Sequence, residues 1–445
     1  MRLKTSKNRP GVSGMKRIAY EELLRWKQKK DRKPLIMYGA RQVGKTWLLK
    51  EFGANEYQNV AYLNFDSTSE AKDLFIDYDT ARLIRAFSAL TGVSIQPGET
   101  LVILDEIQEA PAALTALKYF CEEAPEYHIV AAGSLLGIEI HSGTGFPVGK
   151  VDEIHLYPLS FEEFLMAFGK NVLVQQLKEH QWNQLQAITR VYMEVLRQYY
   201  YVGGMPEVVK EYVAGQDFTS TRKVQKQILA DYHRDFSKHI PADLLPKVRL
   251  VWDSLAAQLA KENKKFIYGV LKKGARAKDF ENAIEWLSNA GLVHKVNRVS
   301  KVEKPLKFYE DSAAFKLYCL DLGLLGAMVD MSAKDVIVKN DAFTEYKGAF
   351  TEQYVFQEML AHGIHPYYYS KENSTLEIDF LFQKDCLYMV EVKAEENLRS
   401  KSLKTLHEAN VSAKAMRFSM ADYRVQEWLT NVPLSFVGEW IEQLK

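Results

Sequence analysis

The chain has 445 residues, of which 47% are hydrophobic, and a formal net charge of +1. A chain of this length is expected to form two to four domains with substantial cores. The near-neutral charge excludes whole-chain attraction to nucleic acid or membrane, so any such contact must come from a local patch. No apolar run approaches the about 20 residues that span a bilayer, and the three cysteines lack metal-ligand spacing. These features predict a reduced, cytoplasmic protein without a membrane span.

The first predicted elements are a leader and a phosphate-binding loop. Residues 1–34 are basic, include an expected N-terminal helix, and lack the apolar core of a secretory signal. Residues 35–38, LIMY, predict a buried strand, and the next eight, GARQVGKT, match G-x-x-x-x-G-K-[ST] before a helical pattern. The residues expected to bind ATP are Gly39, Ala40, Arg41, Gln42, Val43, Gly44, Lys45, Thr46 and Trp47.

Each part of the predicted ATP site has a chemical role. Glycines let backbone N–H groups approach the phosphates, and the helix N-terminus favours their negative charge. Lys45 is expected to reach the β- and γ-phosphate oxygens, and the Thr46 hydroxyl to hold Mg²⁺. The apolar strand TLVIL then ends in an acidic pair. Asp105 is expected to hold Mg²⁺ through water, and Glu106 to orient or deprotonate the attacking water.

A third apolar strand, HIVAAG, ends at Ser134. In additional-strand ATPases this strand lies between the other two and carries a polar sensor of the γ-phosphate. A role as a helix cap or turn residue is the alternative for Ser134. Further strands in NVAYLN and DEIHLY, alternating with helices, predict a parallel sheet with helices on both faces. Residues 35–160 are therefore expected to form a P-loop ATPase core of the α/β class.

Helical patterns fill the middle of the chain. Residues 161–240 are interpreted as a helical lid or linker, broken by the Gly-rich stretch YVGGMP. Residues 241–330 are interpreted as helices followed by two short strands, VHKVNRV and PLKFYE, which is the order of a winged-helix domain. Such domains often place their second helix in the major groove of DNA. Here that helix mixes charges, so packing against protein stays an equal alternative: Arg276, Lys278, Asp279, Glu281 and Glu285.

Several segments in chain order resemble prokaryotic AAA-family ATP-binding proteins with a C-terminal DUF4143 region. They include GARQVGKT, LDEIQ, AAGSLLG, YPLSFEEFL, GGMPEVV, WLSNAGLV and LDLGLLGAM. The resemblance covers nearly the whole chain after Met15. It implies a P-loop ATPase core, a helical and winged-helix middle, and a restriction-endonuclease-like domain over residues 331–445 that is similar to PD-(D/E)XK nucleases.

The C-terminal region contains a predicted β-hairpin with charged positions. EIDFLF and LYMVEVK alternate as strands around a turn at QKDC, so Asp379 is expected opposite Glu391. Two carboxylates that close repel unless a cation lies between them, so the pair is either a solvated face or a metal site. Strict alternation assigns the first strand to two faces: Glu377, Asp379 and Leu381 on one, Ile378, Phe380 and Phe382 on the other.

The resemblance favours the metal site. A PD-(D/E)XK site has a helix carboxylate, then Asp on one strand and Glu-x-Lys on the next, and this chain has Glu352, Asp379, Glu391 and Lys393 in that order. Asp379 and Glu391 would bind Mg²⁺ or Mn²⁺, with Glu352 joining directly or through water. Lys393 would orient or activate the water that attacks a phosphodiester. A domain that keeps this fold but only binds is the alternative.

The leading hypothesis is an ATP-hydrolysing switch or motor whose nuclease-like domain acts on nucleic acid. The alternatives are a nucleotide-gated interaction protein with an inactive nuclease-like domain, and a nuclease that the ATPase only regulates. ATP and Mg²⁺ are the expected cofactors, with Mn²⁺ as an alternative at the C-terminal site. DNA or RNA, a protein partner and a second copy of the chain all stay open as partners.

Overall fold

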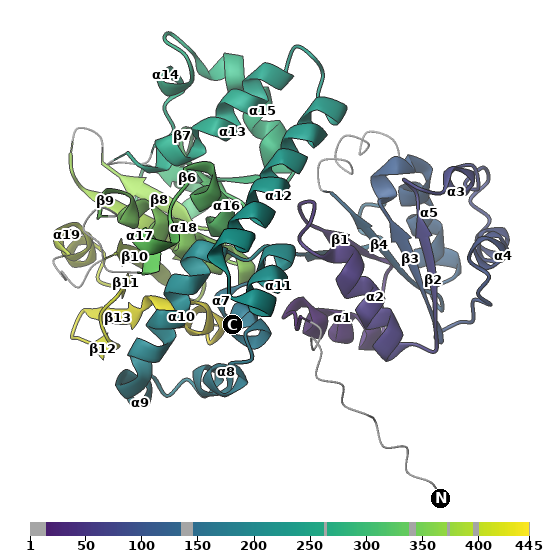
Figure 1. Ribbon diagram of the computed structural model, residues 1–445, viewed down its shortest axis with the longest axis horizontal. Helices are drawn as coiled ribbons and strands as arrows, with labels where there is room; N and C mark the ends of the chain where they lie inside the picture. Colours follow the sequence, from purple (N-terminus) through teal and green to yellow (C-terminus); the bar gives the residue numbers. More distant parts are fainter. Residues whose placement is uncertain are drawn as a thin grey trace, which may run out of the picture.

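The computed structural model describes residues 15–134, 146–261, 265–337, 344–371, 374–394 and 400–444. Within these residues the strands form a five-stranded and an eight-stranded sheet. Figure 1 shows the five-stranded sheet with α1 to α5 on one side of the molecule, and the eight-stranded sheet with most other helices on the other. We call the second part the body. None of the helices in these described segments is long and apolar enough to cross a membrane.

The five-stranded sheet is entirely parallel, in the order β2-β3-β4-β1-β5. Its strands are β1 Leu35–Tyr38, β2 Asn59–Asn64, β3 Thr100–Asp105, β4 His128–Gly133 and β5 Asp152–His155. The position of β4 between β1 and β3 confirms the additional-strand order. Strands β1, β3 and β4 are buried along their whole length, which explains why the sequence shows them as unbroken apolar runs.

Helices cover both faces of this sheet, as predicted. They are α1 Ala19–Gln28, α2 Lys45–Glu56, α3 Ser69–Lys72, α4 Thr80–Thr91 and α5 Pro111–Glu123. Leu35 and Met37 of β1 pack in one hydrophobic cluster with residues of α1 and α2. Ile36 and Tyr38 pack in another with residues of α4 and α5. The alternation along β1 therefore separates two layers of helices.

The helical middle follows β5. Its helices are α7 Phe161–Ala167, α8 Asn171–Lys178, α9 Trp182–Leu185, α10 Thr189–Val202, α11 Pro206–Gly215, α12 Phe218–His239, α13 Leu245–Leu259, α14 Tyr268–Leu271 and α15 Ala277–Asn289. A reciprocal capping box between Ser160 and Glu163 starts α7. The hairpin β6 Val293–Val299 and β7 Glu310–Cys319 comes next. The strand expected in PLKFYE begins only at Glu310, because Leu306–Tyr309 form a 3-10 turn.

The eight-stranded sheet has the order β12-β13-β11-β10-β9-β8-β6-β7. Its other strands are β8 Tyr367–Ser370, β9 Glu377–Gln383, β10 Leu387–Lys393, β11 Lys414–Ser419, β12 Arg424–Val425 and β13 Leu429–Pro433. The helices here are α16 Leu322–Met328, α17 Ala333–Ile337, α18 Thr344–Ala361, α19 Lys401–Ala409 and α20 Val437–Glu442. Because β6 pairs in parallel with β8, this mixed sheet continues across residue 330. The boundaries expected at 34, 160, 240 and 330 stay predictions about independent folding.

Strand β9 departs from strict alternation. On β8, Tyr367 pairs with Leu381 and Tyr369 with Ile378, so three steps along β9 oppose two along β8. Ile378 and Leu381 consequently share one hydrophobic cluster, and Phe380 lies in another. The expectation that Leu381 lies on the face opposite Ile378 is therefore wrong, because the extra residue reverses the faces in the middle of the strand.

Two backbone segments meet at the buried carboxylate of Asp321, and a third joins them through Gly204. The carboxylate accepts hydrogen bonds from the N–H groups of Gly204, at 2.6 Å, and of Leu324, at 2.9 Å, where it caps α16. Burial raises the pKa of Asp321 to about 6. The Leu159 N–H donates to the Gly204 carbonyl at 2.7 Å. A Cβ on Gly204 would overlap the backbone of Leu159, so only glycine allows this approach.

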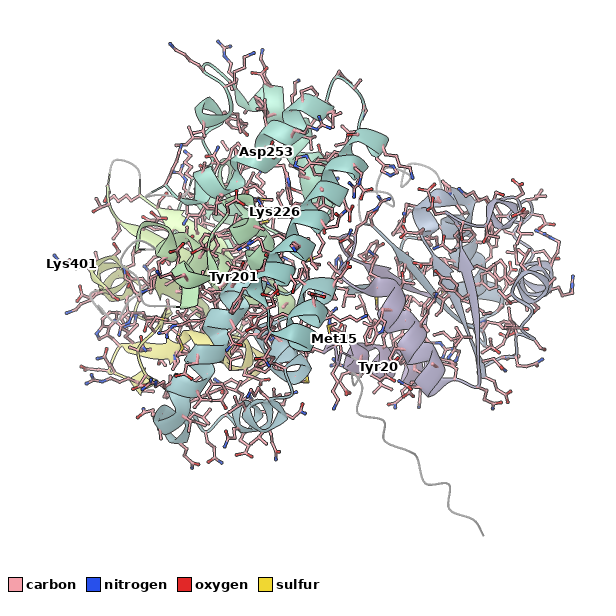
Figure 2. The ribbon with its side chains drawn as sticks, in the orientation of Figure 1. Met15, Tyr20, Tyr201, Lys226, Asp253 and Lys401 are labelled. Carbon is pink, nitrogen blue, oxygen red and sulfur yellow. The ribbon has the colours of Figure 1, made fainter. Side chains whose placement is uncertain are left out.

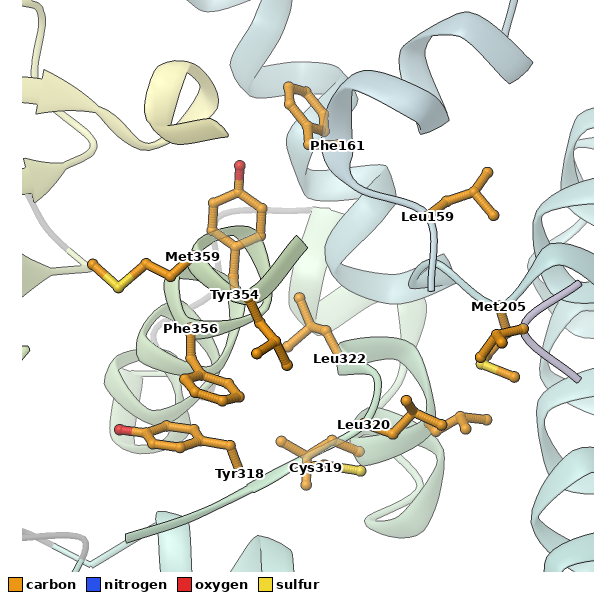
Figure 3. Packing of buried hydrophobic residues seen from close by; sticks show 14 of the residues in the cluster. Leu159, Phe161, Met205, Tyr318, Cys319, Leu320, Leu322, Tyr354, Phe356 and Met359 are labelled. Carbon is orange, nitrogen blue, oxygen red and sulfur yellow. The ribbon is translucent and has the colours of Figure 1, made fainter. Parts of the chain in front are cut away.

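Apolar side chains surround this junction. Figure 3 shows Leu320 and Leu322 between α18 and the segment around Leu159 and Met205. Tyr318 of β7 stacks on Phe356 of α18, with ring centroids 4.4 Å apart and planes 15° apart. The junction therefore joins α7, α16, α18 and the loop between α10 and α11 in one core.

We expect Gly204→Ala to lower the free energy of unfolding by about 3 kcal/mol, because the new methyl group must displace backbone rather than a flexible side chain. Gly215→Ala is the matched control, since a Cβ at the end of α11 meets open space and should change stability by under about 1 kcal/mol. Urea unfolding followed by circular dichroism measures both. Equal stabilities of the two variants would contradict the backbone contact described for Gly204.

Candidate functional site

The loop between β1 and α2 has the backbone of a phosphate-binding loop. Gln42 and Gly44 both have positive φ, 66° and 96°, and Gly44 precedes the first residue of α2. A Cβ on Gly39 would overlap the carbonyl of Leu156, so glycine lets the loop leave β1 close to the end of β5. The N-terminus of α2 then lies at the loop, where its N–H groups favour an anion.

Lys45 is held by the loop itself. Its Nζ is buried and donates to the carbonyl oxygens of Gly39 and Ala40, both at 2.9 Å. Burial lowers the pKa of Lys45 to about 8, against the opposing influence of Glu106 and Asp105, which favour the charged form. The ammonium therefore lies near the predicted acidic pair, as the ATP-site interpretation requires.

Asp105 ends β3 and binds three donors. Its Oδ2 accepts hydrogen bonds from the Thr46 hydroxyl and the Tyr62 hydroxyl, each at 2.8 Å, and its Oδ1 accepts one from the Glu106 N–H at 3.1 Å. Thr46 and Asp105 thus present adjacent oxygens, the ligand type that Mg²⁺ requires. The sequence-based site omitted Tyr62, which β2 holds beside β3. Its position in an alternating strand gave no signal of this role.

Glu106 has an unusual backbone conformation. Its φ and ψ are 54° and 45°, a left-handed region that non-glycine residues occupy at a cost of about 1 to 3 kcal/mol. The Glu106 carboxylate accepts a hydrogen bond from the buried Gln108 amide. Ser134 directly follows β4, and the next residues lie outside the described part of the chain. Trp47 on α2 is 41% exposed, so its contact with nucleotide stays a prediction.

Helix α12 contacts the variable positions of the phosphate loop. The Arg41 guanidinium pairs with Asp235, and the Gln42 amide donates to Asp231 at 3.3 Å. The Tyr232 hydroxyl donates to the Arg41 carbonyl at 2.9 Å. Figure 1 shows α12 running along the side of the body that faces the five-stranded sheet. No local pattern assigns these α12 residues a role, because their partners lie almost 200 residues earlier in the chain.

A second set of contacts fixes the same loop from the N-terminal side. Arg17, just before α1, is buried and donates to the Val43 carbonyl at 2.9 Å and to the Tyr157 carbonyl at 2.6 Å. It also pairs with Glu163, the capping residue of α7, at 3.0 Å. The phosphate loop is therefore connected to both the leader and the body.

In the C-terminal region, a lysine outside the predicted site lies among the carboxylates. Lys316 of β7 is fully buried, and its Nζ is 3.1 Å from Glu352 Oε1 and 2.8 Å from Glu377 Oε1. The Tyr318 hydroxyl donates to the same oxygen of Glu352. Burial alone would lower the pKa of Lys316, but Glu352, Glu377 and Asp379 raise it above its ordinary value. Lys316 is therefore charged, and it supplies a cation to this cluster.

The four expected nuclease-site residues divide between two faces of the sheet. The predicted hairpin is present, with β9 and β10 antiparallel. Tyr388 of β10 packs in the cluster that contains α18 residues, and Leu387 in the one that contains α19 residues. Glu391 and Lys393 follow Leu387 in the alternation, lie on the α19 side and pair with each other at 2.9 Å. Glu352, on α18, lies on the opposite side.

These residues do not fit the expected Mg²⁺ or Mn²⁺ cluster. The described parts of the chain contain no group of three or more His, Cys, Asp or Glu side chains placed to hold a metal ion. Asp379 accepts a hydrogen bond from the Val392 N–H at 2.7 Å, and its charge helps to raise the pKa of Lys316. Glu391 Oε2 is buried without a hydrogen-bond partner among the described residues, but one oxygen is not a metal site. The expected convergence fails because the alternation of β10 turns Glu391 away from α18.

Comparison with known families agrees with the nucleotide site. Residues 31–165 match the family described as AAA domain, residues 193–335 match DUF8612, and residues 347–437 match DUF4143, the last two being domains of unknown function. The chain carries an AAA domain and a DUF4143 domain. The predicted resemblance is confirmed to this extent, whereas the families say nothing of a nuclease.

Solved structures give more distant similarities. The Walker-type ATPase paby2304 of Pyrococcus abyssi is 15% identical, over 72% of this chain and 98% of that chain, with a TM-score of 0.46. The Aeropyrum pernix ORC1 protein in complex with DNA is 12% identical, over 70% and 90%, with a TM-score of 0.28. Cdc6p from Pyrobaculum aerophilum is 11% identical, over 74% and 97%, with a TM-score of 0.27. A search of curated proteins finds no match. These low scores say nothing about what this chain binds.

We expect Lys316→Met to lower the free energy of unfolding by about 3 to 5 kcal/mol, because it leaves carboxylates in a buried site without their cation. Adding Glu352→Gln should recover part of the loss, since it removes one of the unpaired charges. Lys371→Met, at an exposed position directly after β8, is the control and should change stability by under about 0.5 kcal/mol. Chemical unfolding measures all three; a Lys316→Met variant as stable as the control would refute the internal cation.

Proposed function

We propose that this chain binds and hydrolyses ATP and uses its nucleotide state to reposition α12, so that it works as a nucleotide-gated switch. The observation that carries the proposal is the contact of α12 with Arg41 and Gln42, the two variable positions in the middle of the phosphate loop. Nucleotide phosphates bind against the backbone of this same stretch. Any change in the loop on binding ATP or releasing phosphate therefore acts directly on α12.

The proposed catalytic roles follow the contacts of the site. Lys45 supplies a buried positive charge to the phosphates, and Thr46 and Asp105 would hold Mg²⁺. Bound Mg²⁺ neutralises charge that develops on the phosphates. Glu106, fixed by its backbone conformation and by Gln108, orients or deprotonates the attacking water. We keep Ser134 as the proposed γ-phosphate sensor, because it follows the strand between β1 and β3.

Helix α12 is built to transmit movement. Toward the N-terminal end of α12, the buried Gln225 amide donates to the carbonyls of Tyr201 and Val202 at 2.8 and 2.9 Å. Further along, Phe236 packs edge-on against Trp252 of α13 and Trp286 of α15. A shift of α12 would therefore also move the residues that it contacts at the end of α10 and on helices α13 and α15. The proposal matches the alternative of a switch whose C-terminal domain cuts nothing.

Metal-dependent cleavage of nucleic acid has less support. Its one favourable observation is the buried, unpartnered Glu391 Oε2. Against it, Glu352 is neutralised by Lys316 and lies across the sheet from Glu391 and Lys393. We therefore do not propose a cleavage step or a catalytic role for Lys393.

The ATP assignment is tested by two substitutions in the nucleotide site. Lys45→Ala should abolish tight nucleotide binding, because the buried charge opposite the phosphates is lost. Glu106→Gln should still bind ATP but hydrolyse it at least about a hundredfold more slowly, since only the group that activates water is removed. Titration with a fluorescent ATP analogue and phosphate release measure the two effects. Binding by Lys45→Ala as tight as that of the wild type would refute the site.

The switch is tested separately by hydrogen–deuterium exchange. ATP should change the exchange rates of α12 and α13 in the wild type, and Asp231→Asn with Asp235→Asn should remove most of this change while ATP still binds. Asp243→Asn, at an exposed position beyond the end of α12, is the control. If ATP leaves α12 exchange unaltered in the wild type, the switch proposal is wrong, although the ATPase assignment would stand.

A further inference from the structure

The segment that leads from α14 into α15 is strongly basic. Residues 265–278 contain no acidic side chain, and the basic ones are Lys265, Lys272, Lys273, Arg276 and Lys278. All five are exposed. Figure 1 places α14 at an outer end of the body, and Figure 2 shows nitrogen-tipped side chains extending from this end into solvent. The net charge of the chain is only +1, so attraction to an anionic partner would have to come from a local basic patch such as this segment.

The charges in this segment are available to a partner. No described ion pair involves the side chain of Lys272, Lys273, Arg276 or Lys278. The turn that carries the first two is open, since Gly274 has a φ of +79° and a Cβ there would meet nothing within 4 Å. Among the described residues, these four charges therefore have no ion-pair partner, and the turn at Gly274 has no steric cover.

The position of these charges is unfavourable for the isolated protein. Arg276 precedes α15, and Lys278 lies in its first turn. Cations at a helix N-terminus oppose the helix dipole, so these two charges destabilise the start of α15. In that turn, Asp279 alone is acidic, and its carboxylate accepts a hydrogen bond from the Arg276 N–H at 3.0 Å. An anionic partner would relieve this repulsion and also face the N–H groups of α15.

We infer that this segment binds the phosphate backbone of double-stranded DNA. Helices α13, α14 and α15 followed by the β6–β7 hairpin give the chain order of duplex-binding helix–turn–helix modules, and the charges are complementary to a duplex. Glu281 and Glu285 are exposed on the next turns of α15, where they would repel phosphates if the helix entered a groove. The contact is therefore with the backbone through the turn before α15, without readout of base sequence.

A membrane surface fits the same patch less well. The apolar side chains here, Ile267 and Val270, are each only 40% exposed. Helix α14, which carries Val270, has four residues, too few for the long amphipathic face that lies in a lipid interface. The patch offers charge in a compact turn rather than an apolar face to insert.

The experiment measures binding of the full chain to labelled DNA duplexes of two unrelated sequences between about 50 and 200 mM salt. We expect equal affinity for both sequences and a steep fall with salt. Lys272→Glu with Lys273→Glu should weaken binding about tenfold or more and reduce the salt slope by about 2, because two phosphate contacts are lost. The matched control is Lys118→Glu with Lys210→Glu, which changes charge equally at exposed positions on α5 and α11 and should leave both values unchanged.

The outcomes separate this inference from the proposed ATPase switch. Equal weakening by the two double variants would overturn the assigned surface, as would a wild type that binds only an RNA hairpin or anionic vesicles. A sequence preference above about tenfold would overturn backbone contact without base readout. ATP hydrolysis by the double variant at the wild-type rate shows that it folds. A wild-type protein that binds DNA as expected but does not hydrolyse ATP would refute the proposed function without contradicting the DNA contact.

Discussion

The hydrogen bond between the Gly204 N–H and the buried carboxylate of Asp321 is the contact that positions the five-stranded sheet against the body. It fixes Gly204, and two residues later Pro206, the first residue of α11, lies beside Gly44 of the phosphate loop. Several backbone N–H donors make a buried carboxylate tolerable here. The nucleotide site is thus positioned by a junction in the body as well as by its own sheet.

This arrangement explains why the phosphate loop has so many partners outside its own fold. Arg17 holds its backbone from one side, and α12 holds its side chains from the other. The Arg41–Asp235 pair is only partly buried, so it contributes modestly and can be exchanged for contacts with nucleotide at little cost. Buried contacts from Arg17 hold the backbone of the loop, and a partly buried ion pair holds the Arg41 side chain.

The sequence was sufficient where local pattern decides structure. The loop after β1 and the apolar runs of β3 and β4 form as predicted, because each depends on residues within a few positions. The sequence was insufficient where distant segments meet. Neither the pairing of β6 with β8 nor the contact of Lys316 with Glu352, 36 residues away, leaves a periodic signal. The extra residue in β9 also could not be predicted, although it is a local feature. One inserted residue exchanges the two faces of a strand, so the alternation predicted the wrong face for Leu381.

Lys316 gives the C-terminal sheet a property that a metal-held cluster would lack. A lysine amino group is part of the polypeptide, so it is present in every copy of the chain and cannot dissociate. The carboxylates around it are therefore neutralised to the same extent whether divalent ions are scarce or abundant. The charge balance of this region is therefore built into the polypeptide and does not vary with the concentration of free Mg²⁺.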